Sequence, residues 1–217
     1  MQRILGRFTV GKTSRQAETI DYYQPEKGRA LNTFNRILEI SLDVITREGV
    51  EALNTNRIAL DCGINISTLY HYFPNKDSIL HALYTRWFEQ LSTVAEKHRE
   101  DRHKAHKLRA AYKHYVLDLL RIDGFPPRAA VELERAIKTR KNLLALDNDI
   151  VERSITAYAE DILAHRPETE ESRLPIPSAF MLVSIWGAIS IAADMDESEY
   201  PAIAEHCAEM MVALIRH

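Results

Sequence analysis

Glycine and proline are scarce in this sequence, since its 217 residues include only 7 glycines and 8 prolines. Both residues interrupt regular structure, so their scarcity leaves room for long helices. No stretch alternates apolar and polar residues for long enough to indicate a strand. The sequence therefore predicts an all-α protein with about nine helices.

Cysteine is also rare, because the chain contains only Cys62 and Cys207. No Cys-x-x-Cys pair and no zinc-type Cys/His spacing accompanies them, which excludes a disulfide-rich scaffold and a zinc finger. This pattern indicates a reduced, cytoplasmic protein. A redox switch between the two cysteines is the minor alternative, since a buried cysteine usually behaves as a small apolar side chain.

Long apolar runs are nearly absent. The N-terminus lacks the continuous apolar segment of a signal peptide. One uncharged run, Leu174 to Ala193, has about the length of a membrane helix. Pro175 and Pro177 interrupt its front, and Gly187 lies within the remainder. We therefore expect a packed core or interface helix here and no membrane span.

Catalytic and cofactor motifs are missing as well. The sequence has no Gly-x-Ser-x-Gly, no phosphate- or dinucleotide-binding glycine pattern and no His-Glu-x-x-His. His98, His103 and His106 share a charged run, and the spacing of the last two would suit a metal ion. The neighbouring lysines and arginines repel cations, so a solvated face is the expectation. We predict no catalytic residue, no metal and no cofactor, and hence no enzyme.

Helical spacing of apolar residues divides the chain. Residues 1–28 show no steady period and carry several basic side chains, which predicts a flexible basic arm. The predicted helices are 29–48, 55–62, 66–73, a long helix from Lys76, and then about 108–122, 127–140, 147–165, 177–194 and 200–216. The expected helix-starting caps are Thr55, Asn65 and Asn75, and the expected stops are Gly49 and Gly63.

The stretch from Ser67 to Lys76, STLYHYFPNK, combines two surfaces on one short helix. The apolar side consists of Ile66, Leu69, Tyr70 and Phe73, with Tyr70 at its margin. The other side carries two hydroxyls, an imidazole and a phenol, from Ser67, Thr68, His71 and Tyr72. Small donors and acceptors without bulky charge suit close contact, and base edges in the DNA major groove are a natural target.

The preceding helix ends in Cys62-Gly63-Ile64-Asn65, a tight turn. Two short helices joined in this way predict a helix-turn-helix, in which the second helix enters the groove. Thr55 and Lys76 stand at helix starts, where hydroxyl, ammonium and backbone N–H groups can meet a phosphate.

Residues 30–80 resemble the DNA-binding domain of the tetracycline repressor (TetR) family of bacterial transcription regulators. The residues that carry the resemblance are Thr55, Ile58-Ala59, Gly63-Ile64, Thr68-Leu69-Tyr70-His71-Tyr72-Phe73, Asn75-Lys76 and Leu80. The resemblance implies an N-terminal three-helix DNA-binding domain at 29–76. It also implies an effector-binding and dimerisation domain at 77–217.

The resemblance also implies roles for single residues. Thr68 and Tyr72 would approach bases, Tyr70 and Lys76 would hold phosphates, and Thr55 would hold the opposite flank. The full predicted DNA-binding set is Thr55, Asn65, Ser67, Thr68, Tyr70, His71, Tyr72 and Lys76. Asn65, Ser67, Ile66 and Cys62 depart from the residues common in the family, which leaves the operator sequence open. The basic arm would either track DNA beside this contact or remain a disordered tail.

A dimer would place two such helices on one palindromic operator. Small residues recur in the predicted helix 177–194, and apolar bulk surrounds them. The predicted homodimer interface consists of Phe180, Ser184, Gly187, Ala188, Ile191, Met210, Met211 and Leu214, and the alternative is that both helices belong to one chain's core.

In the family, the middle helices enclose a pocket for a small effector that weakens DNA binding. The predicted pocket residues here are Trp87, Phe88, Tyr112, Tyr115, Tyr158 and Trp186. Apolar walls with phenol hydroxyls indicate a hydrophobic or aromatic effector. The predicted function is therefore a dimeric, ligand-responsive repressor. The alternatives are a helical ligand-binding protein or an interaction module that retains the motif but does not regulate through DNA.

Overall fold

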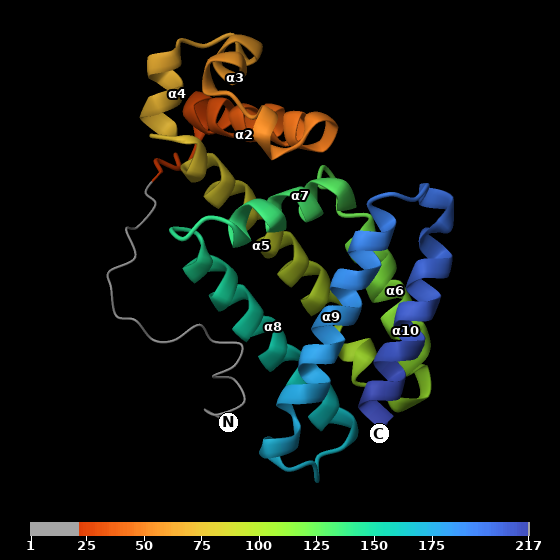
Figure 1. Ribbon diagram of the computed structural model, residues 1–217. Coiled ribbons are helices and arrows are strands. Elements are labelled where there is room, and N and C mark those ends of the chain that lie inside the picture. The colour runs from red at the N-terminus through yellow and green to blue at the C-terminus, as the bar shows by residue number, and fades with distance from the viewer. Residues whose placement is uncertain (1–21, 217) are drawn as a thin grey trace. The chain divides into compact units, whose positions relative to one another are not determined.

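The computed structural model describes residues 22–216, and all their regular structure is helical (Figure 1). The α-helices are α2 (Gly28–Glu48), α3 (Thr55–Cys62), α4 (Ile66–Tyr72), α5 (Lys76–Arg102), α6 (Leu108–Leu120), α7 (Pro127–Lys138), α8 (Leu144–His165), α9 (Pro175–Ala192) and α10 (Tyr200–Arg216). Short 3-10 helices occur at η1 (Val50–Ala52), η2 (Ala105–Lys107), η3 (Glu171–Arg173) and η4 (Glu197–Glu199). The predicted all-α class is confirmed, and the predicted helix ends differ by only a few residues.

The chain divides into two compact units. Within the described residues, the N-terminal unit comprises residues 22–89 and 123–147, and the C-terminal unit comprises residues 90–122 and 148–216. The division lies within α5 and α8, whereas the sequence predicts a functional boundary after residue 76. The helix-turn-helix thus shares its compact unit with the first part of α5 and with α7.

The N-terminal unit is built on one face of α2. Phe34, Ile37, Leu38, Val44 and Ile45 are buried along that helix, at the spacing of an amphipathic surface. Helices α3 and α7 and the 3-10 turn η1 pack against α2, and α4 packs against α3. Gly49 ends α2 with a φ of 83°, a conformation that favours glycine. The predicted stop at Gly49 is confirmed.

Residues 22–28 of the predicted flexible arm have a defined place in this unit. The Tyr22 ring lies beside Phe34 and Phe73, with centroid distances of 6.1 and 5.9 Å. The Tyr23 backbone N–H donates to the carbonyl of Tyr72 at 3.0 Å. Aromatic packing therefore orders the end of the arm, which the absence of a helical period did not reveal. The rest of the arm, residues 1–21, lies outside the described residues.

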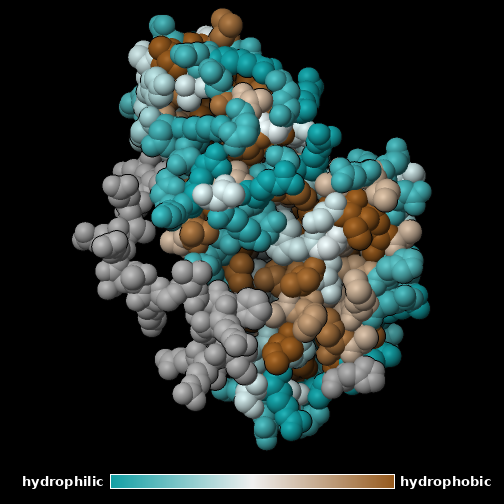
Figure 2. Space-filling view, in the orientation of Figure 1, coloured by the Kyte–Doolittle hydropathy of each residue, from teal (hydrophilic) through white to brown (hydrophobic). Residues whose placement is uncertain are grey.

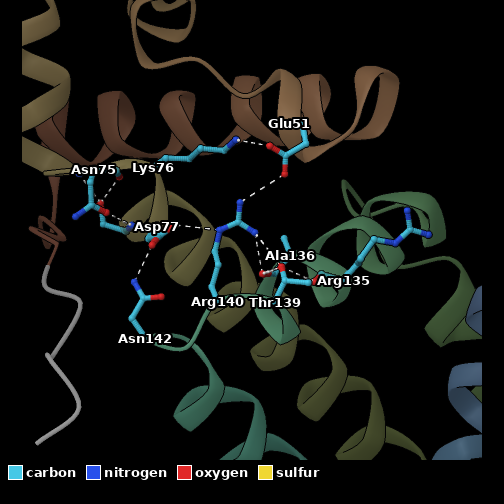
Figure 3. Close-up of polar contacts among 10 residues, drawn as sticks. Glu51, Asn75, Lys76, Asp77, Arg135, Ala136, Thr139, Arg140 and Asn142 are labelled. Atoms are coloured by element: carbon cyan, nitrogen blue, oxygen red, sulfur yellow. Dashed lines mark hydrogen bonds and ion pairs between the residues drawn. The ribbon is translucent and has the colours of Figure 1, made fainter.

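A polar network joins the start of α5 to the segment after α7 (Figure 3). Arg140 donates from Nε to Asp77 Oδ1 at 3.1 Å and from Nη1 to the Ala136 carbonyl at 2.8 Å. Its Nη2 lies 3.7 Å from Glu51 Oε1. Asn142 donates to the second oxygen of Asp77 at 2.7 Å. One guanidinium thus connects η1, the first turn of α5 and the end of α7.

The C-terminal unit consists mainly of α6, α9 and α10, which pack against one another. Its buried apolar side chains include Val116, Met181, Ile189, Met211 and Ile215. Cys207 is also buried here, and burial raises the pKa of its thiol to about 12. Cys62 is buried in the other unit, and both cysteines are free. Burial of both thiols therefore disfavours their reactive thiolate form.

The segment Glu171–Ala192, which contains α9, is the one part of the described chain that is long and apolar enough to cross a membrane. Only 33% of its most apolar window is buried. Length and composition alone are weak support for a membrane span, because core helices of soluble proteins pass the same criteria.

A buried ion pair lies in the C-terminal unit. Arg102 donates from Nε to Asp161 Oδ2 at 2.9 Å, and the two residues are only 3% and 1% exposed. Tyr112 donates its hydroxyl to the same oxygen at 2.7 Å, and His103 Nε2 lies 2.9 Å from the other. The Arg102 guanidinium also lies 4.4 Å above the Tyr115 ring. The prediction that the charged run around His98 and His103 forms a solvated face is therefore wrong at Arg102.

We predict that Asp161→Asn lowers the free energy of unfolding by about 3–5 kcal/mol, because it leaves the Arg102 charge buried without a counter-ion. Urea denaturation measures this change. The exposed ion pair of Asp101 with Lys104 supplies the matched control, and Asp101→Asn should leave stability nearly unchanged. Equal effects of the two substitutions would contradict this account of the core.

For the network in Figure 3, we predict that Arg140→Ala speeds hydrogen exchange of the first-turn amides of α5 by roughly fivefold. The reason is that about 1 kcal/mol of ion pairing with Asp77 and Glu51 is lost. Arg135→Ala is the control, since Arg135 is mostly exposed and pairs with Glu132 of its own helix. Exchange rates that match in both variants would show that Arg140 does not hold this turn.

Candidate nucleic-acid interface

Helix α3 begins at a cap different from the one predicted. Asn54 is the N-cap, and its Oδ1 accepts hydrogen bonds from the N–H groups of Asn56 and Arg57 at 2.9 and 3.2 Å. The predicted cap, Thr55, is instead the first helical residue. Because Asn54 satisfies the first amides, the Thr55 hydroxyl is free for another partner.

The turn between α3 and α4 depends on Gly63. Its φ of 65° and ψ of 35° are left-handed, and Ile64 N–H closes the turn on the Ala59 carbonyl at 3.0 Å. The predicted stop at Gly63 is confirmed. Asn65 stands at the N-cap of α4 as predicted, but its side chain makes no capping hydrogen bond. The Asn65 side chain is exposed.

Helix α4 packs against the rest of its unit through one side. Leu69 and Phe73 are fully buried, and Ile58, Ala59 and Cys62 are buried on the facing helix α3. On the other side, Ser67 and His71 are exposed, and Thr68 is partly exposed. Five of the predicted DNA-binding side chains thus reach the surface on or beside α4, namely Asn65, Ser67, Thr68, Tyr70 and His71.

Thr55 and Tyr70 are brought together. The Thr55 hydroxyl lies 3.2 Å from the Tyr70 hydroxyl, and Tyr70 is 45% exposed. Residues from two helices, 15 positions apart, thus form one pair of hydroxyl groups at the surface. Two adjacent hydroxyls can both donate to an anionic oxygen, which suits a phosphate group.

Lys76 lies at the first position of α5, where Asn75 caps the helix as predicted. The Ser78 N–H donates to Asn75 Oδ1 at 2.9 Å, and the Asn75 N–H donates to Ser78 Oγ at 3.2 Å. The Lys76 ammonium is 3.9 Å from Glu51 Oε2, and the Glu51 side chain is almost fully exposed. Because this contact is long and exposed, it is weak and leaves Lys76 available to a stronger anion.

Tyr72 is the one predicted DNA-binding residue that the structure buries. It is 6% exposed, and its ring packs on Phe34 and Tyr23, with centroids 6.2 and 6.0 Å away. The prediction that Tyr72 faces outward is corrected accordingly. A helical wheel of α4 cannot include Tyr23, which comes from a segment more than forty residues earlier and covers this position.

The structure brings three of the predicted pocket residues together. Tyr112, Tyr115 and Tyr158 gather in the C-terminal unit, where the hydroxyls of Tyr115 and Tyr158 are 3.2 Å apart. Trp87 lies in the other unit, stacked 5.9 Å from Phe125, and Phe88 precedes the division of α5. Trp186 is partly exposed on α9. The three tyrosines are therefore assembled in one place.

Arg102 and Asp161 complete that tyrosine cluster, and the sequence did not single them out. Burial raises the pKa of Tyr112 and of Tyr158 well above the usual range, so both phenols stay neutral. The signal available was a charged pair on helices that also carry aromatic residues. A charged run ordinarily indicates a solvated face, so the sequence pattern does not reveal the buried Arg102–Asp161 pair.

The predicted dimer residues fall into two classes. Phe180, Gly187, Ile191 and Met210 are exposed, and Ser184 and Leu214 are partly exposed. Ala188 and Met211 are buried in the core of their own chain, so for these two the expectation of an exposed position is corrected. Apolar side chains gather over α9 (Figure 2), including Ile176 and Val183, which the sequence prediction had omitted.

Comparison with known proteins agrees with this geometry. Residues 37–83 match the family model described as bacterial regulatory proteins, tetR family. The chain is 31% identical over 77 residues to a helix-turn-helix-type regulator in the dhlA 5′ region of Xanthobacter autotrophicus. It is 30% identical over 88 residues to a regulator of the same type from Staphylococcus aureus. The alignments cover 35% and 41% of this chain and only 38% and 48% of those relatives.

Solved structures extend the likeness to the whole fold. Salmonella enterica GusR superposes with a TM-score of 0.71 at 15% identity, covering 89% of this chain and 100% of GusR. A TetR-family regulator from Streptomyces coelicolor superposes with a TM-score of 0.65 at 16% identity, covering 85% of this chain and 94% of the other. These identities support the shared fold alone.

The family match covers the helix-turn-helix whose geometry is described above, and the prediction of a regulator and not an enzyme agrees with it. Residues 37–83 therefore form a DNA-binding helix-turn-helix domain of the TetR family of transcriptional regulators.

Proposed function

We propose that the chain is a homodimeric repressor that binds a palindromic operator through α4 and is released by a small hydrophobic or aromatic effector. Its site of action would be the cytoplasm, where bacterial DNA lies. One observation carries the proposal. Helix α4 has a fully buried anchoring side and an outward side made of Ser67, Thr68, Tyr70 and His71.

The outward side chains fit duplex DNA by their chemistry. Ser67, Thr68 and His71 are short donors and acceptors that can approach base edges in the major groove. The Thr55–Tyr70 hydroxyl pair and the Lys76 ammonium lie on flanking helices and fit phosphate oxygens. Base reading and backbone positioning would thus come from different elements of one rigid unit.

Dimerisation is supported by an apolar stripe along α9. Ile176, Phe180, Val183 and Ile191 are all more than half exposed, and at helical spacing they share one side with Gly187. Space beyond the Gly187 Cα is open, so a partner helix can approach closely there. A two-fold axis through this stripe would pair two reading helices, with half-sites about 34–36 Å apart on DNA.

An effector site is supported most by the tyrosine cluster of the C-terminal unit. Tyr112, Tyr115 and Tyr158 contribute neutral hydroxyls and aromatic walls beside the Arg102–Asp161 pair. A planar aromatic effector could stack on these rings and exchange hydrogen bonds with the phenols. Release from DNA would require that the effector bind the non-reading arrangement more tightly, with a coupling of about 1–3 kcal/mol.

We predict that Tyr70→Ala weakens DNA binding by about tenfold or more, because it removes both a phosphate donor and the partner that orients Thr55. The probe is a duplex selected from a random library with the wild-type protein, and fluorescence anisotropy measures the affinity. For wild-type protein, affinity should also fall steeply with salt, with a slope near −0.9 per phosphate neutralised.

The matched variant Tyr70→Phe keeps the ring and removes only the hydroxyl. Its affinity for DNA should therefore lie between those of wild type and Tyr70→Ala. Thermal unfolding establishes that both variants remain folded. If the wild-type protein selects no DNA sequence, the interaction-module alternative replaces the repressor. If Tyr70→Ala binds the selected duplex as well as wild type, the assignment of Tyr70 to a phosphate is wrong.

We predict that Val183→Glu converts the dimer to monomers in sedimentation velocity, since Val183 is 64% exposed in the middle of the α9 stripe. A buried, unpaired carboxylate would destabilise the interface by several kcal/mol. The control is Ala157→Glu on the exposed side of α8. A dimer that survives Val183→Glu contradicts the interface, and wild-type protein that partitions into lipid vesicles would point to a membrane role for α9.

A further inference from the structure

Tyr22 and Tyr23 pack at the C-terminal end of α4 and lie outside the residues matched by the family model. The link is a backbone one, because Tyr23 N–H donates to the carbonyl of Tyr72 at 3.0 Å. That carbonyl belongs to the last turn of α4, whose carbonyls have no partner within the helix. The segment before α2 therefore caps the reading helix.

Tyr22 anchors this segment. Its ring packs beside both Phe34 and Phe73 and lies 5.6 Å from the His81 ring. Partial burial raises the pKa of Tyr22, so the phenol stays neutral. Phe34 and Phe73 are themselves core residues of the N-terminal unit, stacked 5.0 Å apart. Tyr22 is thus anchored to the core of the N-terminal unit.

Tyr23, the next residue, turns the other way. Its ring stacks on Tyr72 at 6.0 Å with an interplanar angle of 23°, and it flanks His71 at 5.2 Å. Tyr72 is 6% exposed beneath it, whereas Tyr23 is 51% exposed. At this edge of α4, the phenol that faces solvent is therefore the one from Tyr23, and it is contiguous with the exposed His71 side chain.

We propose that Tyr23 is a DNA-contacting residue, and that it takes the place on the reading surface that the helical pattern assigns to Tyr72. This inference rests on the proposed function. In a helix-turn-helix the N-terminal residues of the reading helix approach base edges, whereas Tyr23 lies at the C-terminal end of α4. The structure therefore assigns the Tyr23 hydroxyl to a phosphate oxygen of the DNA backbone, and Tyr22 is its positioning residue.

Preorganisation favours this contact. A tyrosine on a free arm would lose rotamer entropy and backbone entropy on binding DNA. Tyr23 is already partly ordered before it meets DNA, because its N–H is bonded to Tyr72 and its ring packs on Tyr72 and His71. The competing interpretation is that Tyr23 only covers Tyr72 and stabilises the fold. Removal of the Tyr23 hydroxyl alone distinguishes the two interpretations, because covering Tyr72 requires only the Tyr23 ring.

The test compares Tyr23→Phe with Tyr72→Phe in the full chain, on the duplex selected with wild-type protein. Tyr23→Phe should weaken binding by about three- to tenfold, the effect of one lost hydrogen bond to a charged acceptor. The loss should be equal on the selected duplex and on unrelated DNA, because a phosphate contact carries no sequence information. Tyr72→Phe should change the affinity less than twofold, roughly the limit of the measurement.

Affinity loss in Tyr72→Phe but not in Tyr23→Phe would overturn the proposal, as would unchanged affinity in both. Chemical nitration of unmodified wild-type protein provides a second measurement that needs no variant. Bound DNA should protect both Tyr23 and Tyr70, which are about equally exposed in the free chain. Protection of Tyr70 without Tyr23 would exclude the contact. Wild-type protein that selects no DNA would instead refute the proposed function itself.

Discussion

The burial of Leu69 and Phe73 is the constraint on which the reading surface depends. These two side chains leave no exposed area, and each contributes about 1.5–3 kcal/mol by its transfer from water. Helix α4 has only seven residues and would not be stable alone. Its outward side chains therefore have a fixed direction only because its inward ones are held by α3 and by Phe34 of α2.

The two compact units use charge in different ways. In the N-terminal unit, Arg140 ties α7 to η1 and to the start of α5 through partly exposed pairs, which cost little to break (Figure 3). In the C-terminal unit, Arg102 and Asp161 are buried and hydrogen-bonded, so separating them is expensive. The ion pairs around Lys76 are thus weak and partly exposed, whereas the tyrosine cluster surrounds a buried, hydrogen-bonded ion pair.

Much of this site could be predicted from sequence, and the exceptions have one cause. Gly63, Asn75, and the buried side of α4 follow from local rules, because backbone conformation, capping and helical period act within a few residues. For Tyr72 and Arg102, the sequence of their own helices predicts an exposed position. Their covering partners, Tyr23 and Asp161, come from 49 and 59 residues away in the chain, beyond the reach of any periodic pattern.

The sequence alone determined the helices, their order, the helix-turn-helix and the family, since these depend on spacing and on residue types along one stretch. Only the tertiary structure decided which phenol reaches the surface beside His71, which charges are buried, and that Thr55 meets Tyr70. The physical reason is that a side chain is buried by residues of another segment. That segment becomes its neighbour only when the chain folds.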